Sequence, residues 1–281
     1  MPNPSVTNAD GGVKHARLEG MKLVFVGLGK MGRSILEGVL AAEFLSPDEI
    51  GAIDQGPERT RELAALYGIS PLENGDLASA ERVLIAVQPK QFPKIAERIA
   101  HPQVGYLSIM AGVSTAVLAR RLGTRRVVRA MPNLAATIRK STTALTAPKE
   151  AQEGGDLEFA VRLFKTVGDA YPLPERLFDA FTGMAASAPA YLAIVAEALA
   201  DGGVKMGIPR SEALSFAADV LVATGELMRL KHPAVIKDEV ASPGGTTIHG
   251  VAALEEGRVR HALVRAVEAA TLRGHELGEE E

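Results

Sequence analysis

Two glycine-containing segments near opposite ends of the chain have the residue types and spacing to bind small anions. The later one, SPGGTT at residues 242–247, leads into a helical pattern that begins at Ile248. Paired glycines let backbone N–H groups converge, and the start of a helix adds the positive end of its dipole. Such a corner can hold a small carboxylate while the hydroxyl of Thr246 or Thr247 reaches a neighbouring atom.

The earlier segment has the pattern Gly27-x-Gly29-x-x-Gly32, directly after an apolar run at residues 23–26 and at the start of a helical pattern that continues through Leu40. In this context the first glycine allows a tight turn, the second lets the backbone approach a pyrophosphate, and the third allows a helix to pack closely on a strand. The segment therefore predicts a dinucleotide site, and a purely structural glycine turn is the alternative.

Asp54 ends the next apolar run, about twenty residues beyond the glycines, where an acid commonly accepts a hydrogen bond from the ribose 2′-hydroxyl of NAD. Arg59 and Arg61 follow on the predicted helix and could instead approach a 2′-phosphate. A third interpretation is that Asp54 only caps the turn into that helix. These residues leave the choice between NADH and NADPH open.

The elements that must position these residues alternate between strands and helices. Strand-like runs lie at residues 23–26, 50–53, 83–87, 106–109, 127–130 and 143–146. Strands that alternate with helices predict βαβ units in a largely parallel sheet. From about Pro174 the runs stop and alanine-rich helical patterns take over. We therefore expect an α/β fold: a Rossmann-like doubly wound sheet at residues 21–174, then an all-helical dimerisation domain at residues 175–281.

Two further loops leave the predicted sheet at the edge where such folds bind ligands. One contains Ala86, Val87, Gln88 and Pro89, and the other, at residues 108–113, contains Ala111. Ligands of open α/β sheets bind beyond the carboxyl ends of the strands, so these loops are placed to contact a ribose and a nicotinamide. Ordinary turn formation is the alternative.

Composition excludes several classes of function. The net charge of −3 and the 4% aromatic content give no basis for binding nucleic acid. There is no cysteine, and the six histidines are scattered, so no metal site is expected. The apolar stretch Gly183–Ala200 contains Pro189 and Glu197, which favours a buried helix over a membrane span. Residues 1–20 are polar without an apolar run, so we expect a disordered leader or an upstream start extension. The absence of cysteine leads us to expect a cytoplasmic protein.

From residue 21 to about residue 274 the chain resembles the pyrroline-5-carboxylate reductase family. The resemblance rests on the motifs GLGKMG, AVQP, SIMAGV, RAMPN, SAPAYLAIVAEALADGGVKMGIPR and DEVASPGGTTIHGVAALEEG, in that order. It implies reduction of 1-pyrroline-5-carboxylate to L-proline with NAD(P)H, usually NADPH. It also implies subunits that pair as homodimers, or higher homo-oligomers, through their helical domains. Each active site would lie where the sheet domain meets the helices of the dimer.

The resemblance also assigns roles residue by residue. The loop of Gly27, Leu28, Gly29, Lys30, Met31 and Gly32 would hold the pyrophosphate, and Asn74 would lie near the adenosine ribose. The nicotinamide end would be lined by Ala86, Val87, Gln88, Pro89 and Ala111. The substrate carboxylate would lie in the corner made by Ser242, Gly244, Gly245 and Thr246, with Glu175 beside the substrate. Thr247 would bind the substrate and could relay a proton to the ring nitrogen.

The sequence departs from the family pattern at three places, and two other functions remain open. Gln88 replaces the usual lysine, residues 134–136 replace the usual TPA, and Ala185-Ala186 replace a glycine–serine pair. One alternative is a β-hydroxyacid dehydrogenase or related imine reductase that uses Lys205, although Gly207 and Pro209 follow so closely that a solvated helix end is the simpler interpretation of that lysine. The other is a nucleotide-binding sensor without turnover.

Overall fold

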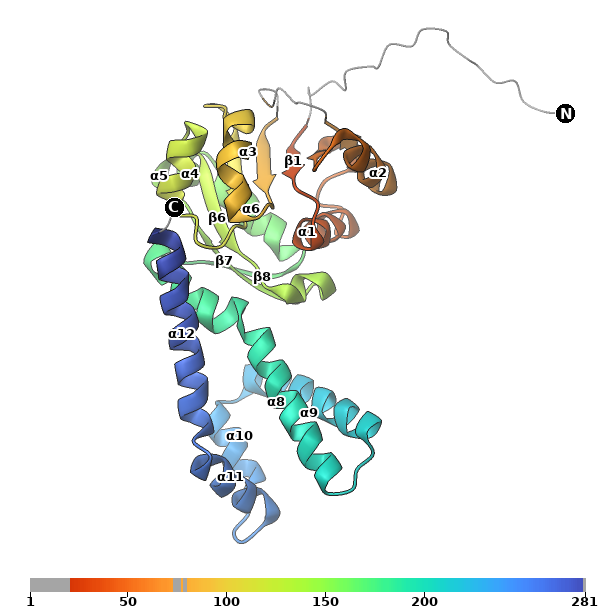
Figure 1. The fold of residues 1–281 in the computed structure, drawn as a ribbon, viewed down its shortest axis with the longest axis vertical. Coiled ribbons are helices and arrows are strands. Elements are labelled where there is room, and N and C mark those ends of the chain that lie inside the picture. The colour runs from red at the N-terminus through yellow and green to blue at the C-terminus, as the bar shows by residue number, and fades with distance from the viewer. Residues whose placement is uncertain (1–20, 73–76, 78–79, 280–281) are drawn as a thin grey trace, which may run out of the picture.

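The computed structural model describes residues 21–72, 77 and 80–279, and it consists of a sheet domain followed by a helical domain (Figure 1). The predictions for Asn74 and for the leader at residues 1–20 lie outside these residues. The last strand ends at Pro172, and the first 3₁₀ turn of the helical domain begins at Glu175.

One sheet forms the centre of the first domain, in the order β3-β2-β1-β4-β5-β6-β7-β8. Its strands are β1 (Leu23–Val26), β2 (Ile50–Ile53), β3 (Ser70–Pro71), β4 (Arg82–Ile85), β5 (Gly105–Ser108), β6 (Val127–Met131), β7 (Ser141–Thr146) and β8 (Gly168–Pro172). All neighbours pair in parallel except β6 and β7. The prediction of a largely parallel sheet is confirmed. The sequence did not predict β3 and β8, which are edge strands without an apolar run.

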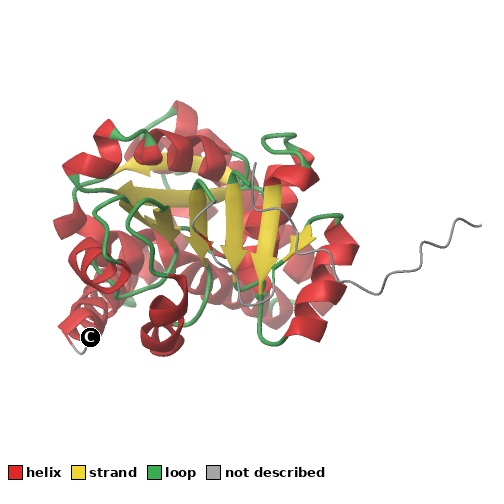
Figure 2. Ribbon diagram, turned by 90° about the horizontal axis from the view of Figure 1, so that it is seen from above, coloured by secondary structure: helices red, strands yellow, loops and turns green. Residues whose placement is uncertain are grey.

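Helices cover both faces of the sheet, as Figure 2 shows from above. They are α1 (Lys30–Ala41), α2 (Pro57–Tyr67), α3 (Phe92–Ile99), α4 (Thr115–Leu122), α5 (Lys149–Glu153) and α6 (Asp156–Lys165). Successive residues of β1 point to opposite faces, so Leu23 and Phe25 pack with α1, α2 and α6, whereas Val24 and Val26 pack with α3 and α4. The doubly wound arrangement is therefore confirmed, with a separate apolar core on each face.

The second domain is all helical, as predicted. It contains α7 (Phe178–Phe181), a π-helix (Thr182–Ala186), α8 (Ala188–Lys205), α9 (Arg210–Leu230), α10 (Pro233–Val240), α11 (Thr246–Glu256) and α12 (Val259–Glu279). The two long helices α8 and α9 lie side by side, and α12 runs back to the sheet domain, where Leu277 contacts Gly112 (Figure 1). Helices α10 and α11 lie at the far end of the molecule.

The helical domain has little interior of its own. Its buried cluster consists of three small side chains, Ala200, Ala213 and Ala217. The segment Glu175–Lys205 is the one helical stretch in the described part of the chain that is long and apolar enough to cross a membrane, yet only 11% of its most apolar window is buried within this chain. The apolar surface of these helices is therefore uncovered in a single copy.

Candidate active site

The three glycines of the early segment meet three different steric conditions. Gly27 has φ +95°, and a Cβ there would lie 2.7 Å from the carbonyl oxygen of Ala86. A Cβ on Gly32 would lie 2.4 Å from the carbonyl oxygen of Gly27, so only glycine lets α1 begin this close to the loop. No heavy atom lies within 4 Å of a Cβ built on Gly29. The loop is thus packed tightly from behind and open at Gly29, where a phosphate can approach the backbone.

Asp54 ties this loop to the end of β2. Its carboxylate accepts hydrogen bonds from the backbone N–H groups of Leu28 and Gln55, each at 2.6 Å, and from Nε of Arg59 at 3.1 Å. The side chain is only 7% exposed. Both oxygens are therefore already engaged by the protein, so Asp54 acts first as a support for the glycine loop.

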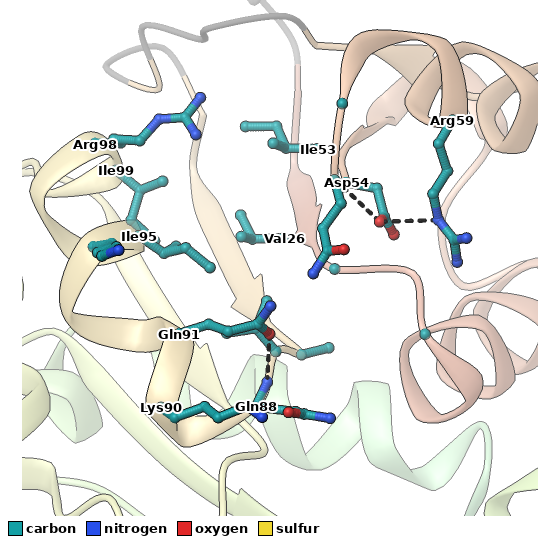
Figure 3. Close-up of a pocket in the computed structure, with 17 residues that line it drawn as sticks. Val26, Ile53, Asp54, Arg59, Gln88, Lys90, Gln91, Ile95, Arg98 and Ile99 are labelled. Atoms are coloured by element: carbon teal, nitrogen blue, oxygen red, sulfur yellow. Dashed lines mark hydrogen bonds and ion pairs between the residues drawn. The ribbon is translucent and has the colours of Figure 1, made fainter.

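A cavity of about 970 Å³ lies in front of this loop, within the size range of small-molecule sites. Figure 3 shows Asp54 and Arg59 on one side and Ile95, Arg98 and Ile99 on the other. Six residues predicted for the cofactor line it: Gly27, Gly29, Asp54, Ala86, Val87 and Gln88. Arg59, which the sequence offered as a possible contact of a 2′-phosphate, lines it too. Sequence reasoning missed the rest of the wall, which comprises Val26, Ile53, Gln55, Gly56, Lys90, Gln91, Lys94, Ile95, Arg98 and Ile99.

Arg59 and three of the missed residues make the cavity cationic. Arg59, Lys90, Lys94 and Arg98 line it, against the single carboxylate of Asp54, although the whole chain has a net charge of −3. The last three recur every fourth residue through a 3₁₀ turn and α3, a spacing that places side chains on one side of a helix. That spacing directly after AVQP is the sequence signal that could have revealed them.

The other residues predicted for the cofactor lie around this cavity without lining it. Leu28 is buried, Gly32 is buried behind the loop, and Met31 packs against the core. Lys30 is exposed at the first residue of α1, and Pro89 begins the 3₁₀ turn Pro89–Gln91. Ala111 is exposed in the loop after β5, two strands away from β1.

The later glycine segment forms a tight corner at the start of α11. Gly244 has φ +67°, a left-handed conformation that favours glycine, and a Cβ on Gly245 would force the hydroxyl of Ser242 to turn away. The backbone N–H of Gly245 donates to the carbonyl oxygen of Ser242 at 3.1 Å. The first N–H groups of α11, from Thr246 onward, have no partner within the helix.

This corner is distant from the cavity in its own chain. It lies at the start of α11, at the end of the helical domain farthest from the sheet (Figure 1). Ser242, Gly244 and Thr246 are exposed there, and Thr247 is half-buried. Glu175 occupies a third place, the junction of the two domains, where its carboxylate accepts hydrogen bonds from Thr115. A single chain therefore does not bring together the residues predicted for cofactor and substrate.

Comparison with known proteins assigns both domains. A family model described as pyrroline-5-carboxylate reductase dimerisation matches residues 175–277, and one described as NADP oxidoreductase coenzyme F420-dependent matches residues 22–112. The pyrroline-5-carboxylate reductase of Thermus thermophilus is 68% identical over 261 residues, which are 93% of this chain and 100% of that protein. The chain belongs to the pyrroline-5-carboxylate reductase family.

Solved structures show the same fold. The pyrroline-5-carboxylate reductase of Coxiella burnetii superposes with a TM-score of 0.82 at 24% identity. The pyrroline carboxylate reductase of Plasmodium falciparum, whose structure has NADP bound, superposes with a TM-score of 0.81 at 23% identity. Each comparison covers 92% of this chain and 99% of the other.

The enzyme reduces 1-pyrroline-5-carboxylate to L-proline, the last step of proline biosynthesis, by transfer of a hydride from NAD(P)H to the ring imine carbon. Residues 22–112 belong to its NADP-binding domain, and the dimerisation match implies that it associates with copies of itself. The dehydrogenase and sensor alternatives are not supported. Lys205, the residue on which the first of them depended, is exposed at the C-terminal end of α8.

Proposed function

We propose that the reductase site is shared between two copies of the chain, with the cofactor in the cavity of one copy and the substrate on the corner of the other. The observation that carries this proposal is the distance of the corner from the cavity of its own chain (Figure 1). The uncovered apolar faces of the helical domain support it, because α9 exposes Phe216, Val220 and Val222 by more than half.

The residues of the cavity fit a dinucleotide. The open backbone at Gly29 and the positive end of α1 suit the pyrophosphate, and the cations opposite Asp54 suit further phosphate charge. The bound nicotinamide supplies the hydride. Six residues complete the cofactor half: Lys30 and Met31 beside the pyrophosphate, Asn74 near the adenosine ribose, and Gln88, Pro89 and Ala111 at the nicotinamide end.

The corner binds and orients the substrate. Ser242, Gly244, Gly245 and Thr246 hold the ring carboxylate through hydrogen bonds from the turn and from the start of α11. The Thr247 hydroxyl hydrogen-bonds the ring nitrogen, which becomes protonated as the C=N bond takes up a hydride at carbon. No strong base is needed, because the reaction consumes one hydride and one proton and has no leaving group. Orientation of the two reactants is the main contribution of the protein.

Mixed dimers test the shared site. Thr247→Ala damages the corner, and Gly29→Glu puts a carboxylate where the pyrophosphate is expected, at a position with room for a side chain. Each variant alone is expected to be inactive. When the two chains are expressed together, half of the dimers are mixed and each mixed dimer has one intact site, so about a quarter of normal activity returns. Recovery below a few per cent, with mixed dimers demonstrated by two affinity tags, contradicts the shared site.

We propose that the cofactor is preferentially NADPH. Four cations line the cavity, and Arg59 can turn from Asp54 to a 2′-phosphate because Asp54 keeps its two backbone donors. Arg59→Ala should lower kcat/KM for NADPH about tenfold and leave that for NADH within about twofold, since a hydrogen bond to a charged group contributes about 1.5 kcal/mol or more. Gln88→Lys, run alongside, tests whether the missing lysine shifts the preference. Equal effects of Arg59→Ala on both cofactors contradict its role in selection.

The oligomer is proposed to be a homodimer, or a higher assembly of dimers, in the cytoplasm. Its apolar helices are then covered by another copy of the chain, and no membrane is needed. Light scattering of the purified enzyme and fractionation of cells that express it test these two points. A monomer that is fully active, or activity in the membrane fraction, contradicts them.

A further inference from the structure

The junction between the domains contains a group of charged side chains that the reaction itself does not require. Glu175, in the first turn of the helical domain, accepts a hydrogen bond from the backbone N–H of Thr115 at 2.8 Å and one from its hydroxyl at 2.5 Å. Thr115 is the first residue of α4, and the N–H groups in the first turn of a helix have no partner within that helix. The carboxylate of one domain thus caps a helix of the other, where the helix dipole favours a negative charge.

Arg129 holds the same carboxylate from the sheet. It lies in β6 and is only 5% exposed, a rare condition for an arginine without carboxylate partners. Its guanidinium lies 3.4 Å from Glu175 and 3.8 Å from Asp179, and it stacks 4.7 Å above the ring of the buried Phe178. All three of these neighbours belong to the helical domain. We refer to Thr115, Arg129, Glu175 and Asp179 as the junction cluster.

The junction cluster is connected to the loop that contains Ala111, which we propose for the nicotinamide, and to helix α12. Thr115 follows the loop containing Ala111 and Gly112, and Gly112 contacts Leu277 at the end of α12. Close packing then joins α12 to the π-helix and α7: a Cβ on Gly183 would lie 2.6 Å from Oγ1 of Thr271, and one on Gly274 would lie 3.5 Å from Asp179. A tilt of α7 about Arg129 would therefore disturb the packing of α12 against the loop that contains Ala111 and Gly112.

We propose that the junction cluster positions the substrate half of the site against the cofactor half, and that Glu175 and Arg129 are positioning residues of the reaction. This inference rests on the proposed sharing of the site, because the corner of a partner copy is carried on the paired helical domains. Glu175 then serves the substrate without touching it. Since the cofactor cavity lies wholly within the sheet domain, loss of the junction cluster slows hydride transfer and leaves cofactor binding intact.

Glu175→Gln tests the proposal, because it keeps the size of the side chain and removes the charge that pairs with Arg129. We expect kcat to fall about tenfold or more, as misplacement of the reactants by a fraction of an ångström does. The dissociation constant of NADPH should change less than about twofold. It can be measured from cofactor fluorescence without interference from tryptophan, which the chain lacks.

Thr115 distinguishes positioning from direct contact with the substrate. Thr115→Val removes the hydroxyl donor to Glu175 and should lower kcat in the same way, whereas Thr115→Ser keeps both donors and should preserve it. In the double variant Thr115→Val/Glu175→Gln the combined loss should be smaller than the sum of the two single losses, because both substitutions weaken the hold on the same side chain. Glu150→Gln, which breaks an exposed ion pair with Arg125 on the sheet domain, is the matched control and should leave kcat unchanged.

Each outcome decides the matter. A kcat that stays within twofold in Glu175→Gln overturns the proposal, as does a cofactor affinity that falls by the same factor as kcat. A raised KM in Glu175→Gln with an unaffected Thr115→Val overturns it in favour of direct substrate binding by Glu175. The mixed-dimer recovery of Thr247→Ala and Gly29→Glu does not involve these residues, so failure of the shared site is recognised separately.

Discussion

The sheet domain and the helical domain differ in how they bury apolar surface. In the first, β1, β4, β5 and β6 lie between two layers of helices, and large side chains such as Phe25, Tyr106 and Phe164 are fully buried. In the second, the buried cluster consists of three alanines, while Ile194, Val222 and Leu230 are more than 60% exposed. The sheet domain buries its apolar core within a single chain, whereas the helical domain leaves apolar surface that only a second molecule can cover.

The two domains differ in the same way as binding sites. The cavity that fits the cofactor is formed entirely by residues of the sheet domain, so one chain contains it whole. The corner that fits the substrate is exposed at the far end of the helical domain. The difference teaches that the sheet domain needs no second copy to bury its interior, whereas the helical domain does, and variants can test each side of the contrast.

The largest effect is expected from a buried carboxylate of the sheet domain. Asp156 is fully buried, and Nε of Arg82 and both Nε and Nη2 of Arg126 donate to it at 2.9 Å. Asp156→Ala leaves two cations without their partner and should lower the free energy of unfolding by about 3–5 kcal/mol, as measured by urea titration at constant protein concentration. Glu150→Ala, at the exposed pair with Arg125, should cost less than about 1 kcal/mol. Equal losses would mean that the interior of this domain does not depend on Asp156.

A smaller but specific effect is expected at the corner of the helical domain. Thr247→Val keeps the shape of the side chain and removes the hydroxyl that reaches the ring nitrogen. We expect kcat to fall about a hundredfold, the usual cost of one lost transition-state donor. Thr247→Ser should recover most of it. Steady-state rates with 1-pyrroline-5-carboxylate check this, and full activity in the valine variant contradicts the assigned role.

Next in size is the effect of a charge on the uncovered helical surface. Phe216 on α9 is 56% exposed in one chain, and Phe216→Asp should weaken association by about 2 kcal/mol or more, roughly thirtyfold in the dissociation constant. Leu66→Asp is the control, because Leu66 on α2 of the sheet domain is even more exposed, at 71%. Light scattering over a dilution series measures both. Equal weakening by the two substitutions would remove the contrast between the domains.

The smallest effect at neutral pH concerns Tyr106 in the sheet core. Burial raises the pKa of its hydroxyl to about 12, above its usual value near 10. Because the folded protein holds this proton more tightly than the unfolded chain does, the stabilisation is complete below pH 10 and is lost as the pH rises from 10 to 12. Tyr106→Phe removes this titration, so its unfolding midpoint should decline less steeply over that range, even though the hydrogen bonds with Ile99 and His101 are also lost. Parallel declines in both proteins would refute the titration.

Much of the sheet domain could be predicted from the sequence because its strands are continuous apolar runs. The runs at residues 23–26 and 50–53 match β1 and β2 residue for residue. The run at residues 83–87 extended too far, since the backbone leaves the sheet after Ile85 and the last two residues turn to line the cavity. Strand β8 was missed because an edge strand that begins with glycine and ends with proline has no apolar pattern.

The glycines of the site could be predicted from the sequence, whereas most of its charged residues could not. The positive φ of Gly27 and the close approach of Gly32 to the carbonyl oxygen of Gly27 are local features, which a motif records. Asp54 left several interpretations open, because only the fold shows that its oxygens bind the backbone of Leu28, 26 residues away in the chain. Lys94 and Arg98 have only a helical spacing as their sequence signal, and they become part of a site only when α3 packs beside β1 and β4.

The sequence by itself determined two glycine-dependent backbone features: the loop at residues 27–32, which we propose for a dinucleotide, and the corner at residues 242–247, which we propose for the substrate. Both depend on backbone conformations that neighbouring residues impose, so a short stretch of sequence records them. Only the tertiary structure decided that the two features lie apart in one chain, that Glu175 caps α4, and that the helical domain leaves its apolar surface uncovered. Those features depend on which distant segments pack together, and that choice is made by burial over the whole chain.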